Sequence, residues 1–326
     1  MALGPNDLRT AVVGVGHFGQ YHLEKYAHLP GAQLVAVADI DKVRGAAVGR
    51  RYGVPAFTDH RRLDGLVDAV SIATPTVTHF EIAKFFLDRG VHVLIEKPIT
   101  TTLTDADELI ALAARQAAVL QVGHQERLFA AQLDLPALTV GPKSIVCRRT
   151  APPTGRSLDC NVVLDLMIHD IDIAQSLLGT EIEGLSANGI SIYSGSEDEA
   201  EARVDFVGGC EVHLYASRSA ERAERTVRIG QADGDLDVDF LNRTCRHARH
   251  GDISTSARHD LTGGINGFPQ TDVVALEVGA FLHSIRTGRR PLVSGQDGRN
   301  ALALALMVND AISAAAPEVA ETRAAS

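Results

Sequence analysis

A glycine-rich turn near the start of this 326-residue chain constrains its fold more than any other sequence feature. The turn has the spacing Gly-x-Gly-x-x-Gly, follows the apolar residues 9–15 and opens a segment of helical pattern at 18–28. In that setting Gly14 permits a tight turn, Gly16 lets the backbone approach a pyrophosphate, and Gly19 lets helix and strand pack closely. The turn therefore predicts a dinucleotide-binding unit, although a glycine-rich turn without a ligand has the same pattern. A bound dinucleotide would contact Gly14, Gly16, His17, Phe18 and Gly19.

The first 123 residues alternate short apolar runs with segments of helical spacing. Runs without polar alternation are typical of parallel strands that are buried on both faces. Residues 1–123 are therefore expected to form an α/β domain of the Rossmann type, a parallel sheet between helices. The predicted strands are 9–15, 33–38, 68–73, 91–95 and 118–122, and the predicted helices are 18–28, 42–52, 78–88 and 104–116.

The pattern changes in residues 124–326, which are expected to form an α+β domain around a large, open, mostly antiparallel sheet. Alternation of apolar and polar residues indicates strands with one covered face. The other face of such a sheet would join subunits into a dimer or tetramer. The predicted elements are a helix at 161–178, strands at 181–193, 201–206, 211–217, 226–230, 234–240 and near 244, a loop at 248–270, and helices at 272–286 and 298–314 that could pack back on the first domain.

Polar residues at the ends of the predicted parallel strands indicate where a dinucleotide would lie. Asp39 ends the second strand, where a carboxylate accepts bonds from ribose hydroxyls and repels a 2′-phosphate, so NAD is favoured over NADP. Arg44, Arg50 and Arg51 leave NADP open, although a solvated helix face explains them as well. Thr74 and Pro75 follow the third strand and are expected beside the dinucleotide, and His79 is either a cofactor contact or a surface histidine.

The segment Ile95-Glu-Lys-Pro98 follows the fourth predicted strand. Pro98 keeps Lys97 out of the helical region of backbone conformation and so fixes its geometry, while the sequence leaves open whether the Lys97-Pro98 bond is cis. A lysine at this position could hold a substrate hydroxyl and stabilise alkoxide character. An ordinary loop lysine is the alternative.

Three ionisable side chains, Asp165, His169 and Asp172, stand in the very apolar segment 161–174. Their spacing places them on one stripe of an α-helix. Because unpaired buried charges are costly, the stripe is either a satisfied structural network or the lining of a polar site.

Taken together, these motifs resemble the Gfo/Idh/MocA family of NAD(P)-dependent sugar and inositol oxidoreductases. The resemblance implies that Lys97 lies near the nicotinamide and the reacting hydroxyl, that His169 transfers the proton and that Asp165 supports it. Asp172 matches a frequent acidic position with a structural or supporting role. We also expect Glu96 and Gln125 to lie in the cofactor site.

A closer resemblance is to the branch of this family that oxidises C3 of UDP-N-acetylglucosamine. It rests on residues 121–124, 151–159, 163–172 and 216–218, whereas 125–129 depart from the branch. It implies oxidation of the 3-hydroxyl to a ketone for a partner aminotransferase, as in a 2,3-diamino sugar or lipid A-type pathway. The candidate contacts to the nucleotide sugar are Lys97, Arg156, Ser157, Asp165, His169 and Arg218, although ordinary loop and strand-edge polarity explains Arg156, Ser157 and Arg218 equally well.

Two other functions stay open at this point. The chain could oxidise another sugar or an inositol, or it could be a catalytically silent dinucleotide sensor that binds a protein partner. A net charge of −10 argues against nucleic acid and anionic membranes as partners. We expect a cytoplasmic protein without a metal site, because no signal peptide or spanning segment is evident and the four cysteines lack paired spacing.

Overall fold

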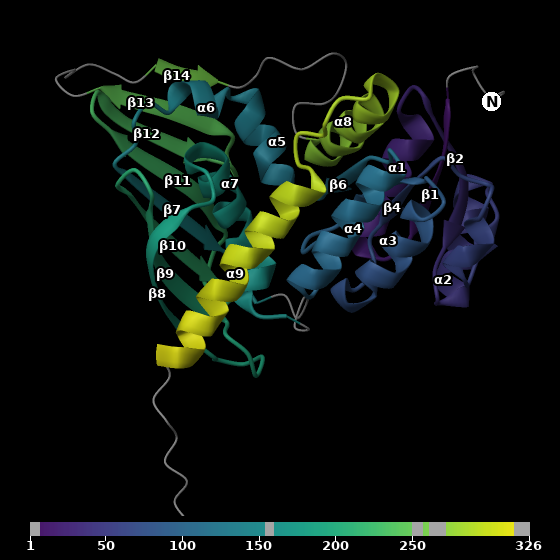
Figure 1. Ribbon diagram of the computed structural model, residues 1–326, viewed down its shortest axis with the longest axis horizontal. Coiled ribbons are helices and arrows are strands. Elements are labelled where there is room, and N and C mark those ends of the chain that lie inside the picture. The colour runs from purple at the N-terminus through teal and green to yellow at the C-terminus, as the bar shows by residue number, and fades with distance from the viewer. Residues whose placement is uncertain (1–6, 154–159, 250–256, 261–271, 316–326) are drawn as a thin grey trace, which may run out of the picture. The chain divides into compact units, whose positions relative to one another are not determined.

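The computed structural model describes residues 7–153, 160–249, 257–260 and 272–315 (Figure 1). The chain divides into two compact units. One comprises Met1–Pro136 and Asp260–Leu302, and the other comprises Ala137–His259 and Ala303–Ser326. None of the helices in the described residues is long and apolar enough to cross a membrane.

The first unit contains a six-stranded sheet in the order β3-β2-β1-β4-β5-β6, and its strand pairs are parallel. This order is that of the Rossmann fold, in which ligands bind beyond the carboxyl ends of the central strands. The strands are β1 Leu8–Val13, β2 Ala32–Ala38, β3 Ala56–Phe57, β4 Ala69–Ile72, β5 His92–Ile95 and β6 Leu120–Val122.

Helices cover this sheet, with α1 packed on α8 and α3 packed on α4 (Figure 1). Buried side chains of β1, α1 and α8 form one continuous core, which includes Val12, Leu23, Tyr26 and Phe281. The helices of this unit are α1 His17–His28, α2 Lys42–Tyr52, α3 His79–Leu87, α4 Leu103–Arg115, α5 Gln125–Gln132 and α8 Val273–Thr287, with short 3₁₀ turns at His60–Leu63 and Thr76–Thr78.

The predicted parallel sheet and its helices are confirmed, and the helix predicted at 42–52 has those bounds. Local chemistry sets this start, because the carboxylate of Asp41 accepts hydrogen bonds from the backbone N–H groups of Val43 and Arg44. The helix ends at Gly53, which has a left-handed φ of 67°. The two-residue edge strand β3 was not predicted, since so short a run has no readable pattern.

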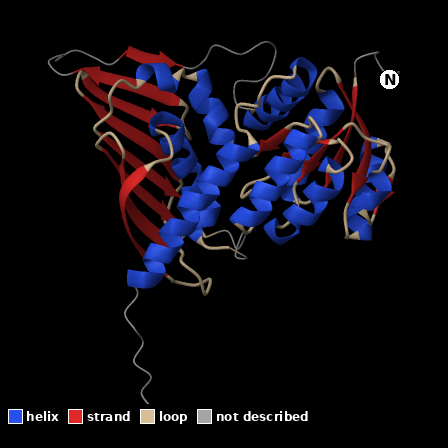
Figure 2. Ribbon diagram, in the orientation of Figure 1, coloured by secondary structure: helices blue, strands red, loops and turns tan. Residues whose placement is uncertain are grey.

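The second unit contains an eight-stranded sheet in the order β14-β13-β12-β11-β7-β10-β9-β8 (Figure 2). It is mostly antiparallel, as predicted, with a parallel pair of β7 and β10. The strands are β7 Ser144–Thr150, β8 Ile182–Ile190, β9 Glu199–Phe206, β10 Cys210–Ser217, β11 Glu224–Gln231, β12 Gly234–Asp239, β13 Thr244–Arg249 and β14 Ala257–Asp260. The remaining helices are α6 Leu135–Leu138, α7 Ile168–Leu178 and α9 Gly295–Ala315.

Alternating burial along these strands confirms a sheet with one covered face. In β9 the residues Ala200, Ala202, Val204 and Phe206 are buried, while the residues between them are not. Two predictions were wrong in detail. Strand β7 was not predicted, and β14 lies inside residues 248–270, which were expected to form a loop.

The helix predicted at 161–178 is α-helical only from Ile168 onward. Val163–Met167 form a π-helical turn, so the expected regular α-helix over 161–178 was wrong at this point. The side chain of Asn161 accepts a hydrogen bond from the backbone N–H of Leu164 at 3.1 Å, and its amide donates to Glu197 and Asn309. A π turn widens the helical repeat, and such turns are frequent at functional sites.

Candidate functional site

In the glycine-rich turn between β1 and α1, two positions have room only for glycine. Gly14 has a φ of 83°, and a Cβ on it would lie 2.6 Å from the carbonyl oxygen of Ala73. A Cβ on Gly19 would lie 1.9 Å from the carbonyl oxygen of Gly14. At Gly16, by contrast, a Cβ would meet no atom within 4 Å, so its backbone faces open space. This space lies at the amino end of α1, where backbone N–H groups favour phosphate.

A cavity of about 810 Å³ opens beside this turn within the first unit. Its volume is in the range of cofactor sites. Gly14, Gly16, Asp39, Arg44, Thr74 and Pro75 are among the residues that line it. His17 and Phe18, also predicted to contact the cofactor, are exposed at the start of α1, where their rings meet edge to face with centroids 5.5 Å apart. The residues present therefore fit a dinucleotide.

Asp39 is a buried anion at the rim of this cavity. Its oxygens accept hydrogen bonds from the N–H groups of Val15 and Asp41, each at 2.8 Å. The guanidinium of Arg44 donates to both oxygens as well, at 2.9 and 2.8 Å. Burial raises the pKa of Asp39, but the bonds from Arg44 and the backbone outweigh it and hold the pKa below its usual value. The carboxylate predicted to meet the ribose is thus ionised and paired with Arg44.

His79 is buried rather than on the surface, and its exposed fraction is 1%. Nδ1 lies 2.9 Å from the carbonyl oxygen of Pro98, and Nε2 lies 2.9 Å from that of Thr74. Burial lowers the pKa of His79, so the neutral ring donates to one of these oxygens at a time. The histidine therefore bridges the loops after β4 and β5, both of which carry predicted site residues.

Lys97 lies two residues after the end of β5, is half-buried, and is joined to Pro98 by a cis peptide bond. Gln125, predicted to contact the cofactor, begins α5, and its amide donates to the carboxylate of Glu277 at 3.3 Å. The sequence left open whether the Lys97-Pro98 bond is cis, and the structure shows that it is cis.

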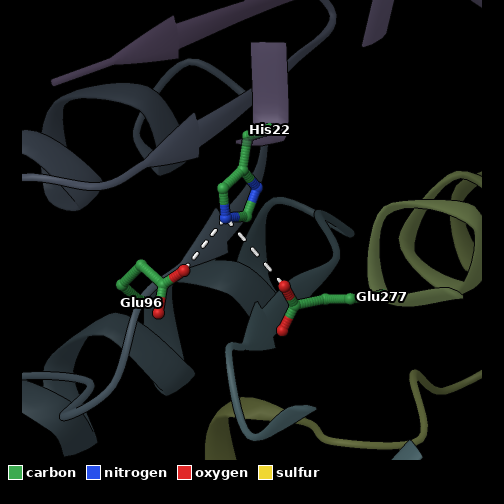
Figure 3. Close-up of side chains that lie close together, drawn as sticks. All are labelled: His22, Glu96 and Glu277. Carbon is green, nitrogen blue, oxygen red and sulfur yellow. Dashed lines mark hydrogen bonds and ion pairs between the residues drawn. The ribbon is translucent and has the colours of Figure 1, made fainter. Parts of the chain in front are cut away.

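The side chains of His22, Glu96 and Glu277 converge from α1, the end of β5 and α8 (Figure 3), and Glu96 is the chain neighbour of Lys97. Nε2 of His22 lies 2.9 Å from Oε1 of Glu96 and 3.9 Å from Oε2 of Glu277. Burial and the neighbouring charge of Glu96 raise the pKa of Glu277 well above its usual value. Burial also acts to raise the pKa of Glu96, but the hydrogen bond and charge of His22 lower it overall. The cluster therefore holds one anion, Glu96, and one neutral acid, Glu277.

In the second unit, the predicted stripe of ionisable residues divides by burial. Asp165 lies in the π turn and His169 in α7, and both are half-buried. Asp172 is fully buried. This pattern agrees with a site role for the first two and a structural role for Asp172.

The neighbour of His169, Asp170, forms a buried ion pair that the sequence analysis missed. The guanidinium of Arg149, in β7, binds both oxygens of Asp170 at 3.1 and 2.7 Å. Both side chains are only 3% exposed. The pair fixes α7 on the sheet beside His169.

Arg218, a predicted substrate contact, is only 4% exposed and is bound within the second unit. Its guanidinium donates to Asp198, to the carbonyl oxygen of Cys160 and to the hydroxyls of Ser194 and Ser196. These contacts favour the structural interpretation of this residue. Arg156 and Ser157, the other two predicted contacts, lie outside the described residues.

Comparison with known proteins agrees with this geometry. Residues 8–124 match the family model described as the oxidoreductase family, NAD-binding Rossmann fold, and residues 148–236 match the GFO/IDH/MocA C-terminal domain. The chain belongs to the Gfo/Idh/MocA oxidoreductase family. The family resemblance read from the sequence is confirmed, and the first unit is its NAD-binding Rossmann fold.

Several known proteins are similar to this chain over most of its length. A UDP-N-acetylglucosamine 3-dehydrogenase from Acidithiobacillus ferrooxidans is 37% identical over 94% of this chain and 98% of its own. A solved structure of it has a TM-score of 0.87 at 36% identity, with the same coverage. A scyllo-inositol 2-dehydrogenase (NAD(+)) from Bacillus subtilis is 28% identical over 90% of each chain. Levoglucosan dehydrogenase in complex with NADH and levoglucosan shares the fold, with a TM-score of 0.82 at 19% identity over 94% and 98% of the two chains.

The sequence analysis of this Gfo/Idh/MocA protein missed His22 and Glu277. A signal for Glu277 was present, because it stands between apolar residues in 273–282 and is the only acid of that stretch. His22 lacked such a signal, since histidine is common at half-buried helix positions. Its relation to Glu96 emerges only when the strands are assembled.

Proposed function

We propose that this chain oxidises the 3-hydroxyl of UDP-N-acetylglucosamine to a ketone, with NAD as the hydride acceptor. The observation that carries the proposal is the 37% identity to a UDP-N-acetylglucosamine 3-dehydrogenase across both units. The more distant inositol dehydrogenase, at 28% identity, supports the coarser assignment to sugar or polyol oxidation.

In the proposed reaction each side chain has one task. A bound nicotinamide supplies the acceptor for the hydride that leaves C3 of the sugar. Lys97 binds the hydroxyl and aligns it, and His169 removes the hydroxyl proton as the carbon–hydrogen bond breaks. Histidine suits this task because its ordinary pKa, about 6.5, is near working pH. Asp165 orients the imidazole and stabilises its charged form.

The proposed preference for NAD over NADP rests on Asp39. Its ionised carboxylate lies at the rim of the cavity, where it would accept bonds from the ribose hydroxyls and repel a 2′-phosphate. The half-exposed Arg44 beside it limits this preference, because a guanidinium binds phosphate well.

Further partners belong to the same proposal. The 3-keto product is a substrate for an aminotransferase, because a ketone condenses with amines. The face of the second unit's sheet that carries Val146, which is 40% exposed, would join subunits into a dimer or tetramer.

A substrate panel tests the function. UDP-N-acetylglucosamine, free N-acetylglucosamine and inositols are each offered with NAD and NADP, and cofactor reduction is followed by its absorbance. We expect turnover with the nucleotide sugar and NAD. Turnover with free sugars or inositols alone would contradict the proposed substrate, and dinucleotide binding without any turnover would favour a sensor.

Variants test the roles of the residues. Lys97→Ala and His169→Ala are each expected to lower kcat by about 10²-fold or more, since general acid–base groups contribute about 10²–10⁴-fold. Lys143→Ala and His28→Ala are the controls, because both residues are exposed. Unchanged rates of NADH formation in both site variants would contradict the proposed roles of Lys97 and His169.

A further inference from the structure

We propose that His22 and Glu277 are positioning residues of the same reaction, which act on Lys97 through the carboxylate of Glu96. The inference rests on the proposed function of Lys97. Neither His22 nor Glu277 belongs to the sequence motifs described above.

The geometry fixes Glu96 from two sides. Because the Glu96 carboxylate is ionised and can only accept, Nε2 of His22 must donate the 2.9 Å hydrogen bond to Oε1. On the other side, a Cβ on Gly123 would lie 2.9 Å from Oε2, so this glycine leaves the room that the carboxylate occupies. Glu96 is the residue before Lys97 in the chain, and a fixed Glu96 therefore fixes the start of the lysine.

The charges agree with this arrangement. The hydrogen bond from His22 and the charge of Lys97 favour the ionised form of Glu96, and the neutral ring of His79 also lies close to it. The groups that act on Glu277 are Glu96, which favours its neutral form, and the amide of Gln125, which opposes this. Burial raises the pKa of Tyr26, which lies close to Glu277, and outweighs the opposing hydrogen bond with Ser71. Two buried anions so close together would be costly, and one neutral acid avoids this.

The cluster also retains polar atoms that a purely structural network would satisfy. Among the described residues, Nδ1 of His22 and Oε1 of Glu277 have no hydrogen-bond partner, although both atoms are buried. Buried polar atoms are satisfied in the large majority of cases, and exceptions concentrate at functional sites. Glu277 is therefore a costly residue for α8 to carry. Its Oε2 lies 3.9 Å from Nε2 of His22, the group that donates to Glu96.

Glu277 also connects the cluster to the end of the sheet. Its carboxylate accepts a hydrogen bond from Gln125, at the start of α5, and its carbonyl oxygen accepts one from Gln121, in β6, at 3.0 Å. Glu277 is therefore linked to β6, which pairs with β5, the strand that precedes Glu96 and Lys97.

A divalent cation is the competing explanation for such a trio. Donor atoms of the three side chains lie within 4.8 Å of one another. The proton on Glu277 leaves the cluster a single anion, however, and the 2.9 Å contact between His22 and Glu96 is that of a hydrogen bond. A metal bound in an equimolar amount, found by elemental analysis of the purified protein and lost in His22→Leu, would overturn the proposal.

Kinetics of four variants test the positioning role. His22→Leu removes the donor, His22→Gln keeps one, and Glu277→Gln imitates the neutral acid. Val278→Ala, the fully buried neighbour of Glu277, is the matched control. For His22→Leu we expect kcat to fall about tenfold or more, with the KM for NAD within about threefold and with recovery in His22→Gln. For Glu277→Gln we expect the alkaline side of the kcat–pH profile to shift by about half a pH unit or more, because the variant has no acid to ionise at this position.

A labelling experiment without substrate separates this inference from the proposed function. The rate at which acetic anhydride acetylates Lys97 at mildly alkaline pH is measured by peptide mass spectrometry, relative to the exposed Lys143. We expect the ratio to change about threefold or more in His22→Leu and not in Val278→Ala. If the wild type oxidises no nucleotide sugar, the proposed function fails, and this ratio alone decides the inference.

Either of two results overturns the positioning role. One is a labelling ratio in His22→Leu equal to that of Val278→Ala. The other is a kcat–pH profile of Glu277→Gln that superposes on that of the wild type. If His22→Leu does not fold, this second result alone tests the positioning role.

Discussion

The guanidinium of Arg44 binds both carboxylate oxygens of Asp39, at 2.9 and 2.8 Å, at the rim of the dinucleotide cavity. The backbone N–H groups of Val15 and Asp41 donate to the same oxygens. Since a carboxylate has about four acceptor positions, those of Asp39 are occupied. Ribose hydroxyls that bind Asp39 must therefore displace Arg44, and a 2′-phosphate would meet Arg44 instead.

This pairing predicts opposite effects of two substitutions on cofactor choice. Asp39→Ala is expected to lower kcat/KM with NAD about tenfold or more, and to raise NADP use relative to NAD, because the repelling carboxylate is lost and Arg44 is released. Arg44→Ala is expected to lower kcat/KM with NADP by a similar factor and to leave that with NAD within about threefold. The measurement is kcat/KM for each cofactor at fixed sugar, with Lys42→Ala as a control. An unchanged ratio of the two cofactors in both variants would contradict this role of the pair.

His79 provides a second prediction, because it bridges the carbonyl oxygens of Thr74 and Pro98. His79→Ala removes the bridge and leaves a cavity, so we expect a loss of about 1–3 kcal/mol of stability. We also expect kcat/KM to fall about tenfold, since both loops carry site residues. Thermal unfolding and cofactor-reduction rates measure the two effects. His28→Ala, on the exposed side of α1, should change neither, and a stable His79→Ala with full activity would refute the bridging role.

Much of the fold was predictable from local patterns. Apolar runs and turn glycines located the central parallel strands within a few residues, because a strand buried on both faces is apolar at nearly every position. Strand β7 has no such apolar run. It contains Arg148 and Arg149, and the buried Arg149 pairs with Asp170 of α7. Such a pairing depends on tertiary structure and not on the residues beside it.

Candidates for the site could be named from the sequence in the same way. The spacing of the glycine turn, and the positions of Asp39 and Lys97 after strands, identified them as candidates. The π turn did not, because the spacing of Asp165 and His169 was read on a regular α-helix. The trio of His22, Glu96 and Glu277 joins the beginning, middle and end of the chain, and only the assembled unit brings these residues together.

The ion pair of Arg149 and Asp170 leads to a third prediction. Arg149→Met leaves a buried carboxylate without its partner, which is expected to cost about 3–5 kcal/mol. Asp170→Asn alone is expected to be destabilising as well, while the double variant should recover part of the combined loss. Urea unfolding of the four proteins measures the coupling. Strictly additive losses would show that the two side chains do not depend on each other.

Glu277 leads to a prediction about stability and pH. Burial and Glu96 hold the pKa of Glu277 well above its ordinary value in the folded protein. As pH rises through that ordinary value, 4.5, the unfolded chain releases this proton and the folded protein retains it. The group therefore contributes a stability that is complete at lower pH and is lost as pH rises toward the folded-state pKa. The slope of this loss is about 1.4 kcal/mol per pH unit for one proton.

Glu277→Gln removes the titrating group and keeps its shape and its neutral form. The variant and the wild type should therefore have similar stability near pH 4, and the variant should become the more stable protein as pH rises to neutrality. Urea unfolding midpoints over this pH range, with Val278→Ala as a control that follows the wild-type slope, measure the difference. Parallel curves for Glu277→Gln and the wild type would mean that Glu277 is ionised in the folded protein. Glu96 would then not be the single anion of the cluster, because Glu277 would be a second one.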